Sequence, residues 1–147
     1  MTLLADPVMR LYAISVAIVI VTLYGLGFWT AKLRNERKAV VNSEDVAING
    51  GARVVEVEHP DVQRIKRAHI NALENAVPFF AIGFLYALTS PNMTMATILY
   101  FGFVGIRVLH AVFYLTARQP FRTMSFTIGA IINLTMVVQV VRAAVAA

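Results

Sequence analysis

The chain of 147 residues contains no cysteine, and only 14% of its residues are charged, against 59% that are hydrophobic. Without cysteine, the protein itself supplies no disulfide, no thiolate nucleophile and no thiolate metal ligand. A typical soluble domain carries about 25% charged residues. The shortage of charge excludes a cytosolic enzyme and a disordered region, and the absence of cysteine excludes a secreted disulfide scaffold. The composition therefore predicts an integral membrane protein.

Three long segments carry no charge at all, namely residues 11–31, 75–106 and 123–141. A helix needs roughly 20 such residues to cross a bilayer core of about 30 Å. The middle segment contains the turn Ser90-Pro91-Asn92, so it belongs to two spans. We predict an all-α, integral membrane four-helix bundle with up-down-up-down topology, a single domain over residues 1–147. Its spans are expected at about residues 8–33, 61–89, 93–117 and 122–145.

The connection between the first two spans is polar. The segment 42–45 resembles a helix start, and Gly50 and Gly51 would end a short helix there. The segment 54–58 partly alternates apolar and polar residues, but one strand alone has no pairing partner, so we expect an extended loop. His59 and Pro60 are typical of a new helix start, and Pro78 is expected to kink that helix.

The formal charge of +5 comes from 13 Lys and Arg residues against 8 Asp and Glu residues. A basic soluble protein would suggest a nucleic-acid partner, but here the cations gather in the connections that follow the first and third spans, so we expect no nucleic acid. Short basic connections stay cytoplasmic. We therefore expect both termini to lie on the outer side of the membrane. The membrane is expected to be a bacterial inner membrane or that of the endoplasmic reticulum. Aromatic residues near span ends are expected to form an interfacial belt: Tyr12, Tyr24, Trp29 and Tyr100.

Ionisable residues at membrane depth are the main functional signal. Each costs roughly 2.5–3.5 kcal/mol on insertion scales, so such residues usually face a cavity or a partner. Helical spacing of three or four residues places two sets on helix faces. The second span carries Arg64, Arg67, Asn71 and Glu74, the third carries Arg107, His110 and Tyr114, and Arg122 and Thr123 open the fourth.

Antiparallel neighbours would bring these sets to one depth and form a cationic pocket. Arginine matches carboxylates in a bidentate fork, so the pocket is typical of a site for an anionic ligand. A purely structural ion-pair network among Arg67, Glu74 and Arg107 is the alternative. We expect no metal site, because the three histidines show no metal-binding spacing.

Three segments resemble signatures of the MAPEG family, the membrane-associated proteins of eicosanoid and glutathione metabolism. Residues 67–79, RAHINALENAVPF, are similar to the family pattern RAHxNxxExxxPF. Residues 107–114, RVLHAVFY, resemble RxxHxxxY, and residues 119–123, QPFRT, resemble the turn that opens the fourth helix. The similarity extends from about Lys32 to the C-terminus. It is closest to the subgroup of microsomal glutathione transferase and inducible prostaglandin E synthase.

The resemblance implies a homotrimer that binds glutathione between neighbouring subunits near the cytoplasmic face. Arg122 would stabilise the glutathione thiolate, and Thr123 would donate its hydroxyl to the sulfur. Ile70 departs from the pattern where the synthase has an arginine, for which Lys66 is a candidate replacement. Thr123 and Phe126 stand where the synthase has Ser and Tyr. The implied glutathione-binding residues are Arg34, Asp45, Arg67, Asn71, Glu74, Arg107, His110 and Tyr114.

The activity implied is that of a membrane-bound glutathione transferase, which joins the thiolate to hydrophobic electrophiles in detoxification. Its other partners would be a hydrophobic or lipid substrate and the bilayer, and a glutathione peroxidase activity on lipid hydroperoxides is a further expectation. A thiol has a pKa of about 8.5, which Arg122 at a helix N-terminus would lower. Two alternatives stay open: a glutathione-dependent isomerase or synthase of oxygenated fatty acids, and a non-catalytic lipid-binding protein. A transporter is disfavoured, since inverted repeats are lacking.

Overall fold

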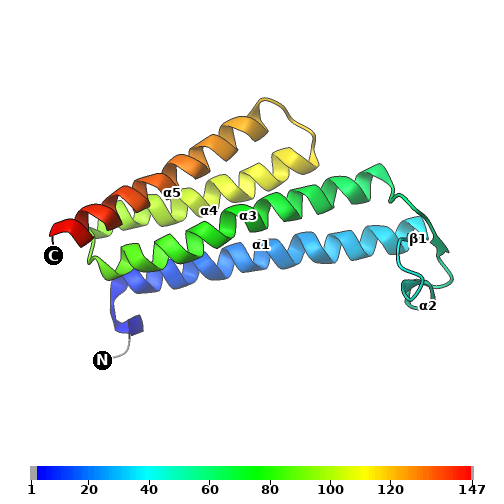
Figure 1. Ribbon diagram of the computed structural model, residues 1–147, viewed down its shortest axis with the longest axis horizontal. Coiled ribbons are helices and arrows are strands. Elements are labelled where there is room, and N and C mark those ends of the chain that lie inside the picture. Colours follow the sequence, from blue (N-terminus) through cyan, green and yellow to red (C-terminus); the bar gives the residue numbers. More distant parts are fainter. Residues whose placement is uncertain (1–2, 147) are drawn as a thin grey trace.

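The computed structural model describes residues 3–146, in which four long helices form a bundle (Figure 1). These helices are α1 (Pro7–Arg37), α3 (Pro60–Leu88), α4 (Met93–Leu115) and α5 (Phe121–Ala146), preceded by the short 3-10 helix η1 (Leu3–Ala5). They alternate in direction, so α1 begins at the end of the bundle where α5 finishes. Each of the four is long and apolar enough to cross a membrane. The prediction of an all-α, four-helix bundle is confirmed.

Local signals in the sequence set the helix starts. Pro7 follows Asp6, whose side chain accepts a hydrogen bond from the amide of Met9 at 2.9 Å. The Asn92 side chain accepts one from the amide of Thr94 in the first turn of α4, also at 2.9 Å. These caps satisfy amides that have no partner within the helix. Helix α3 continues through Pro78.

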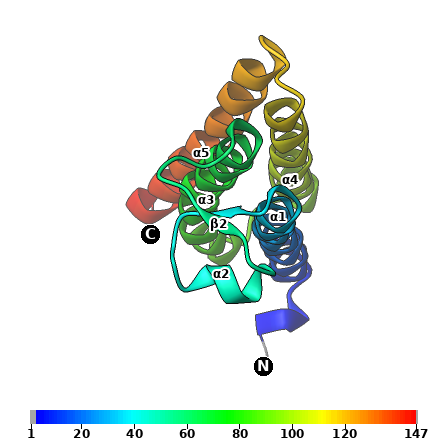
Figure 2. The same ribbon diagram turned by 90° about the vertical axis from the view of Figure 1, so that its right-hand side faces the viewer.

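The connection between α1 and α3 contains structure that the sequence did not predict. The two-residue strands β1 (Ala39–Val40) and β2 (Arg53–Val54) pair in parallel, with Ala39 opposite Arg53 (Figure 2). The expectation of an unpaired loop over residues 54–58 was wrong at its start, where Val54 belongs to β2 and the amide of Val55 donates to the carbonyl of Val40 at 2.8 Å. Residues 56–58 belong to no strand, as expected. The pairing left no periodic signal, because the partner strand has only two residues. The short helix α2 (Asp45–Ile48) lies where it was expected. Gly50 and Gly51, both with positive φ, follow it.

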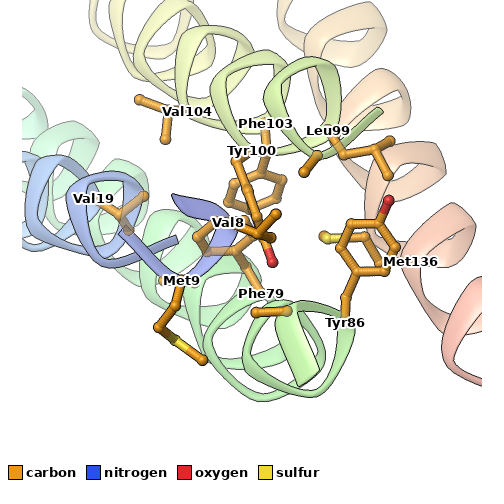
Figure 3. Packing of buried hydrophobic residues seen from close by; sticks show 13 residues of the cluster. Val8, Met9, Val19, Phe79, Tyr86, Leu99, Tyr100, Phe103, Val104 and Met136 are labelled. Carbon is orange, nitrogen blue, oxygen red and sulfur yellow. The ribbon is translucent and has the colours of Figure 1, made fainter. Parts of the chain in front are cut away.

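Helices α3 and α4 each contact the other three long helices, so the core lies around their contact. The rings of Phe79 on α3 and Phe103 on α4 stack there with centroids 4.1 Å apart (Figure 3). Tyr86, Tyr100 and Met136 pack beside them and are almost completely buried. Such aromatic burial contributes most of the packing energy in a core of this kind.

Two tyrosines expected at the membrane interface belong to this core instead. Tyr100 is fully buried, and its hydroxyl donates to the carbonyl of Gly83 at 2.8 Å. The Tyr12 hydroxyl donates to the carbonyl of Phe80 at 2.7 Å. Each hydroxyl finds a backbone acceptor on α3, which removes the cost of burying it.

Candidate functional site

The polar side chains predicted to form a site come from α3, α4 and α5, in the half of the bundle nearest the α4–α5 connection. Arg107 on α4 is almost completely buried. Its Nη2 donates to the Asn71 side-chain oxygen at 3.0 Å and to the Asn71 carbonyl at 3.3 Å. Its Nη1 is buried and has no hydrogen-bond partner among residues 3–146. A buried cation is thus bonded to Asn71 through one nitrogen and has a second nitrogen without a partner in the described chain, an arrangement that is costly unless an anion or acceptor completes it.

His110 lies one turn further along α4, against the start of α5. Its Nδ1 is 3.0 Å from the carbonyl oxygen of Arg122 and 3.1 Å from Ser125 Oγ. The Ser125 hydroxyl donates to the carbonyl of Phe121 at 2.8 Å, and the Arg122 carbonyl only accepts. The hydrogen-bond network therefore assigns the proton to Nδ1. The neutral ring presents Nε2 as an acceptor, and this atom is buried without a partner in the described chain.

Arg122 occupies the first turn of α5, where the amides of the helix N-terminus favour a negative charge. Its guanidinium carbon lies 4.7 Å from the centre of the Tyr114 ring, a cation–π contact between α5 and α4. With the amide oxygen of Gln119 turned toward Arg122, that oxygen accepts from Nη2 at 2.6 Å, and the Gln119 nitrogen donates to Thr123 Oγ1 at 3.1 Å. Tyr114 and Gln119 thus orient a half-buried cation at the rim of the bundle.

Arg34 lies at the end of α1, apart from this group. Its Nε and Nη2 both donate to Oε1 of Glu58, while Lys66 donates to Oε2 at 2.7 Å. Burial raises the pKa of Glu58, but hydrogen bonds and positive charge from Lys66 and Arg34 outweigh it. The pKa of this carboxyl therefore lies below its usual range. Lys66 was the candidate to replace the arginine that the synthase has at the position of Ile70. Its ammonium group is instead bonded to Glu58 in this cluster.

The remaining predicted residues point elsewhere within one chain. Arg67 and Glu74 lie exposed on α3, and Nη1 of Arg67 donates to the Gln63 side chain at 3.3 Å. Asp45 begins α2 and accepts from Asn42 at 3.3 Å. Among residues 3–146, no ion pair joins Arg67, Glu74 and Arg107, which counts against the structural network considered above. A single chain therefore assembles one part of the predicted set and leaves another part facing outward.

Sequence reasoning missed four residues in these clusters. Ser125 contacts His110, Gln119 contacts Arg122, and Glu58 joins Arg34 to Lys66. Gly129 of α5 faces the Arg107 side chain. Of these four residues, only Glu58 was detectable in the sequence, as an acidic residue in a connection that contains several cations. The part of the chain that the structure describes also holds no group of three His, Asp or Glu residues placed to bind a metal ion.

The pattern that defines the MAPEG family matches residues 11–142, almost the whole of the bundle. The chain belongs to the MAPEG family. It is 37% identical over 135 residues to microsomal glutathione S-transferase 1 of Homo sapiens, covering 89% of this chain and 87% of the relative. The Rattus norvegicus protein of that name is 35% identical, covering 95% and 93%. Prostaglandin E synthase of Homo sapiens is 30% identical, covering 93% and 90%. With four apolar helices, this member of the family is an integral, multi-pass membrane protein.

Replacing Asn71 by alanine should destabilise the bundle, because Arg107 would keep only one carbonyl acceptor. A hydrogen bond to a charged group contributes about 1.5–3 kcal/mol, so a fall in the thermal unfolding midpoint is expected in detergent. Asn75→Ala is the matched control, since the Asn75 side-chain amide bonds within its own helix, to the Asn71 carbonyl. Equal midpoints for the two variants would contradict the role of Asn71.

Proposed function

We propose that this protein is a membrane glutathione transferase, which conjugates the glutathione thiolate to hydrophobic electrophiles. The observation that carries the proposal is the group formed by Arg107, Asn71, His110 and Arg122, which three helices bring together at one end of the bundle. It supplies cations, a neutral acceptor and a helix N-terminus in one place. Relatives named microsomal glutathione S-transferase 1, which this chain resembles along nearly all of its length, support the same activity.

The group suits the chemistry of glutathione, which carries two carboxylates, one ammonium and one thiol. Arg107 would bind a carboxylate through its free Nη1, and Asn71 and Tyr114 would supply further hydrogen bonds. Arg122 would stabilise the thiolate by its charge and by the N-terminal amides of α5. Thr123, whose hydroxyl lies in the same turn, would donate to the sulfur. The thiolate then attacks the electrophile, the sulfur–carbon bond forms, and the leaving group departs with its electron pair.

We further propose that the working enzyme is a homotrimer. Arg67, Ile70 and Glu74 are exposed on α3, at the depth of the buried group. Charged side chains facing lipid at that depth are costly, so a neighbouring copy is the better surrounding for them. Glutathione would lie between copies, with its ammonium near Glu74 and a carboxylate near Arg67. Arg34 and Asp45 would approach from the connection between α1 and α3. Because short basic connections stay cytoplasmic, we also propose that this site lies near the cytoplasmic face and that both termini lie outside.

A glutathione-dependent isomerase is the second candidate, because relatives named prostaglandin E synthase match the chain at 30–31% identity. Thr123 and Phe126 favour the transferase, since they stand where that synthase has a different hydroxyl residue and a tyrosine. The apolar Phe126 ring packs against His110 with centroids 6.3 Å apart and offers no phenolic proton. A peroxidase activity on lipid hydroperoxides would use the same thiolate.

The decisive experiment uses the purified full chain in detergent. Adding glutathione should produce the ultraviolet absorbance of a thiolate at neutral pH, and an aryl chloride should be conjugated well above the uncatalysed rate. A lipid hydroperoxide and a prostaglandin endoperoxide, assayed in parallel as substrates, test for peroxidase and isomerase activity respectively. Failure to bind glutathione would overturn the proposal and would favour a non-catalytic, lipid-binding role.

A further inference from the structure

Gly129 is buried in the first half of α5, directly opposite the side chain of Arg107. A Cβ atom placed on Gly129 would lie 3.3 Å from Cδ of Arg107 and 3.7 Å from Cγ2 of Ile106. These are the only atoms of the described chain within 4 Å beyond Gly129's own helix and neighbours, and both belong to side chains. The absence of a side chain at Gly129 therefore makes room for the stem of Arg107. It does not serve to bring another backbone close to α5.

Arg107 has little freedom to yield to a larger residue. Its backbone is fixed on α4, its guanidinium is bonded to Asn71 on α3, and its stem crosses α5 at Gly129. The residue is also 6% exposed, so packed atoms surround it. A contact of 3.3 Å is tighter than an ordinary methyl contact, so an added Cβ would push the Arg107 side chain aside by a few tenths of an ångström.

We propose that Gly129 is a positioning residue for Arg107. By leaving space beside the stem of Arg107, Gly129 determines how far the guanidinium extends across the bundle. With no side chain at Gly129, the stem of Arg107 passes along the backbone of α5 to reach Asn71, and Nη1 has no partner in the described chain. The consequence for glutathione rests on the proposed function: a displaced Arg107 binds a carboxylate of the tripeptide less well. Arg122 and its thiolate chemistry are untouched by this contact.

Gly129→Ala and Gly102→Ala form a matched pair that tests the proposal. Gly102 lies on α4, where an added Cβ would meet only Cδ1 of Ile132, at 3.6 Å, an ordinary contact. Alanine inside a helix is normally more stable than glycine, so Gly102→Ala should raise the thermal midpoint. Gly129→Ala should lower it, and should raise the dissociation constant for glutathione about three- to tenfold. The kcat at saturating glutathione should stay within about twofold.

A double-mutant cycle separates positioning from simple packing. In an Arg107→Ala background no Cδ remains to be displaced, so adding Gly129→Ala should leave the glutathione dissociation constant unchanged. A further loss of affinity there, or a midpoint that rises with Gly129→Ala as it does with Gly102→Ala, would overturn the proposal. If the wild-type protein binds no glutathione, the proposed function fails, and the two midpoints still decide the contact between Gly129 and Arg107.

Discussion

Replacing Arg122 by alanine should abolish the thiolate absorbance of bound glutathione at neutral pH. Without the guanidinium, the thiol returns toward a pKa of about 8.5, at which only a few per cent is ionised at pH 7. Loss of one group that stabilises a developing anion costs about 100-fold in kcat. The affinity for glutathione should change less, because Arg107 and Asn71 lie on α4 and α3 and keep their contacts.

The pH dependence identifies the cause of that loss. Raising the pH toward about 9 ionises the thiol without help, so the Arg122→Ala variant should regain most of its thiolate. Arg122→Lys should recover activity only in part, because an ammonium keeps the charge but neither stacks as a plane on Tyr114 nor forks toward Gln119. Arg118→Ala is the control, since Arg118 is an exposed cation in the same connection. Equal absorbance in the Arg122→Ala variant and in the wild type would exclude Arg122 as the thiolate-stabilising residue.

The helices of the bundle were predictable because each depends on a long, local signal. Uncharged runs, the proline at the start of α3 and the glycines after α2 all act within a few residues of where they stand. The parallel pair β1–β2 and the burial of Tyr100 were not predictable, because each depends on a partner distant in sequence. From the sequence, Tyr100 near a span end is typical of an interfacial residue, whereas in the structure its hydroxyl donates a hydrogen bond to the carbonyl of Gly83 on another helix.

The same distinction applies to the candidate site: local spacing predicted one part of it, and the rest depends on residues distant in sequence. Helical spacing correctly groups Arg107, His110 and Tyr114, and antiparallel packing brings Asn71 and Arg122 to them. Spacing alone could not assign Arg34, because its ion-pair partner Glu58 is 24 residues away in sequence. Gly129 carries no chemical group, and its importance comes only from the side chain that lies against it. Arg67 and Glu74 lie exposed on α3, although their helical spacing had grouped them with Asn71.

Replacing Glu58 by glutamine should destabilise the protein at neutral pH by about 2 kcal/mol. The Glu58 side chain is 5% exposed and is bonded to Arg34 and Lys66, which are 27% and 43% exposed. Losing one member of a fully buried ion pair costs about 3–5 kcal/mol. The cost here is smaller because both cations can regain water. The midpoint of thermal unfolding in detergent measures the effect, and Glu56→Gln, an exposed acid in the same connection, should change it little.

The effect of Glu58→Gln must also disappear in acid. The pKa of Glu58 is lower in the folded protein than in the unfolded chain, where a glutamate titrates near about 4.3. The stability due to its ionisation is therefore fully present above that unfolded value and is lost as the pH falls through the lower, folded value. Wild type and Glu58→Gln should differ most above about pH 5 and converge as the pH falls below the folded pKa of Glu58. A difference that persists unchanged in acid would show that shape or packing, and not the carboxylate charge, links the end of α1 to the start of α3.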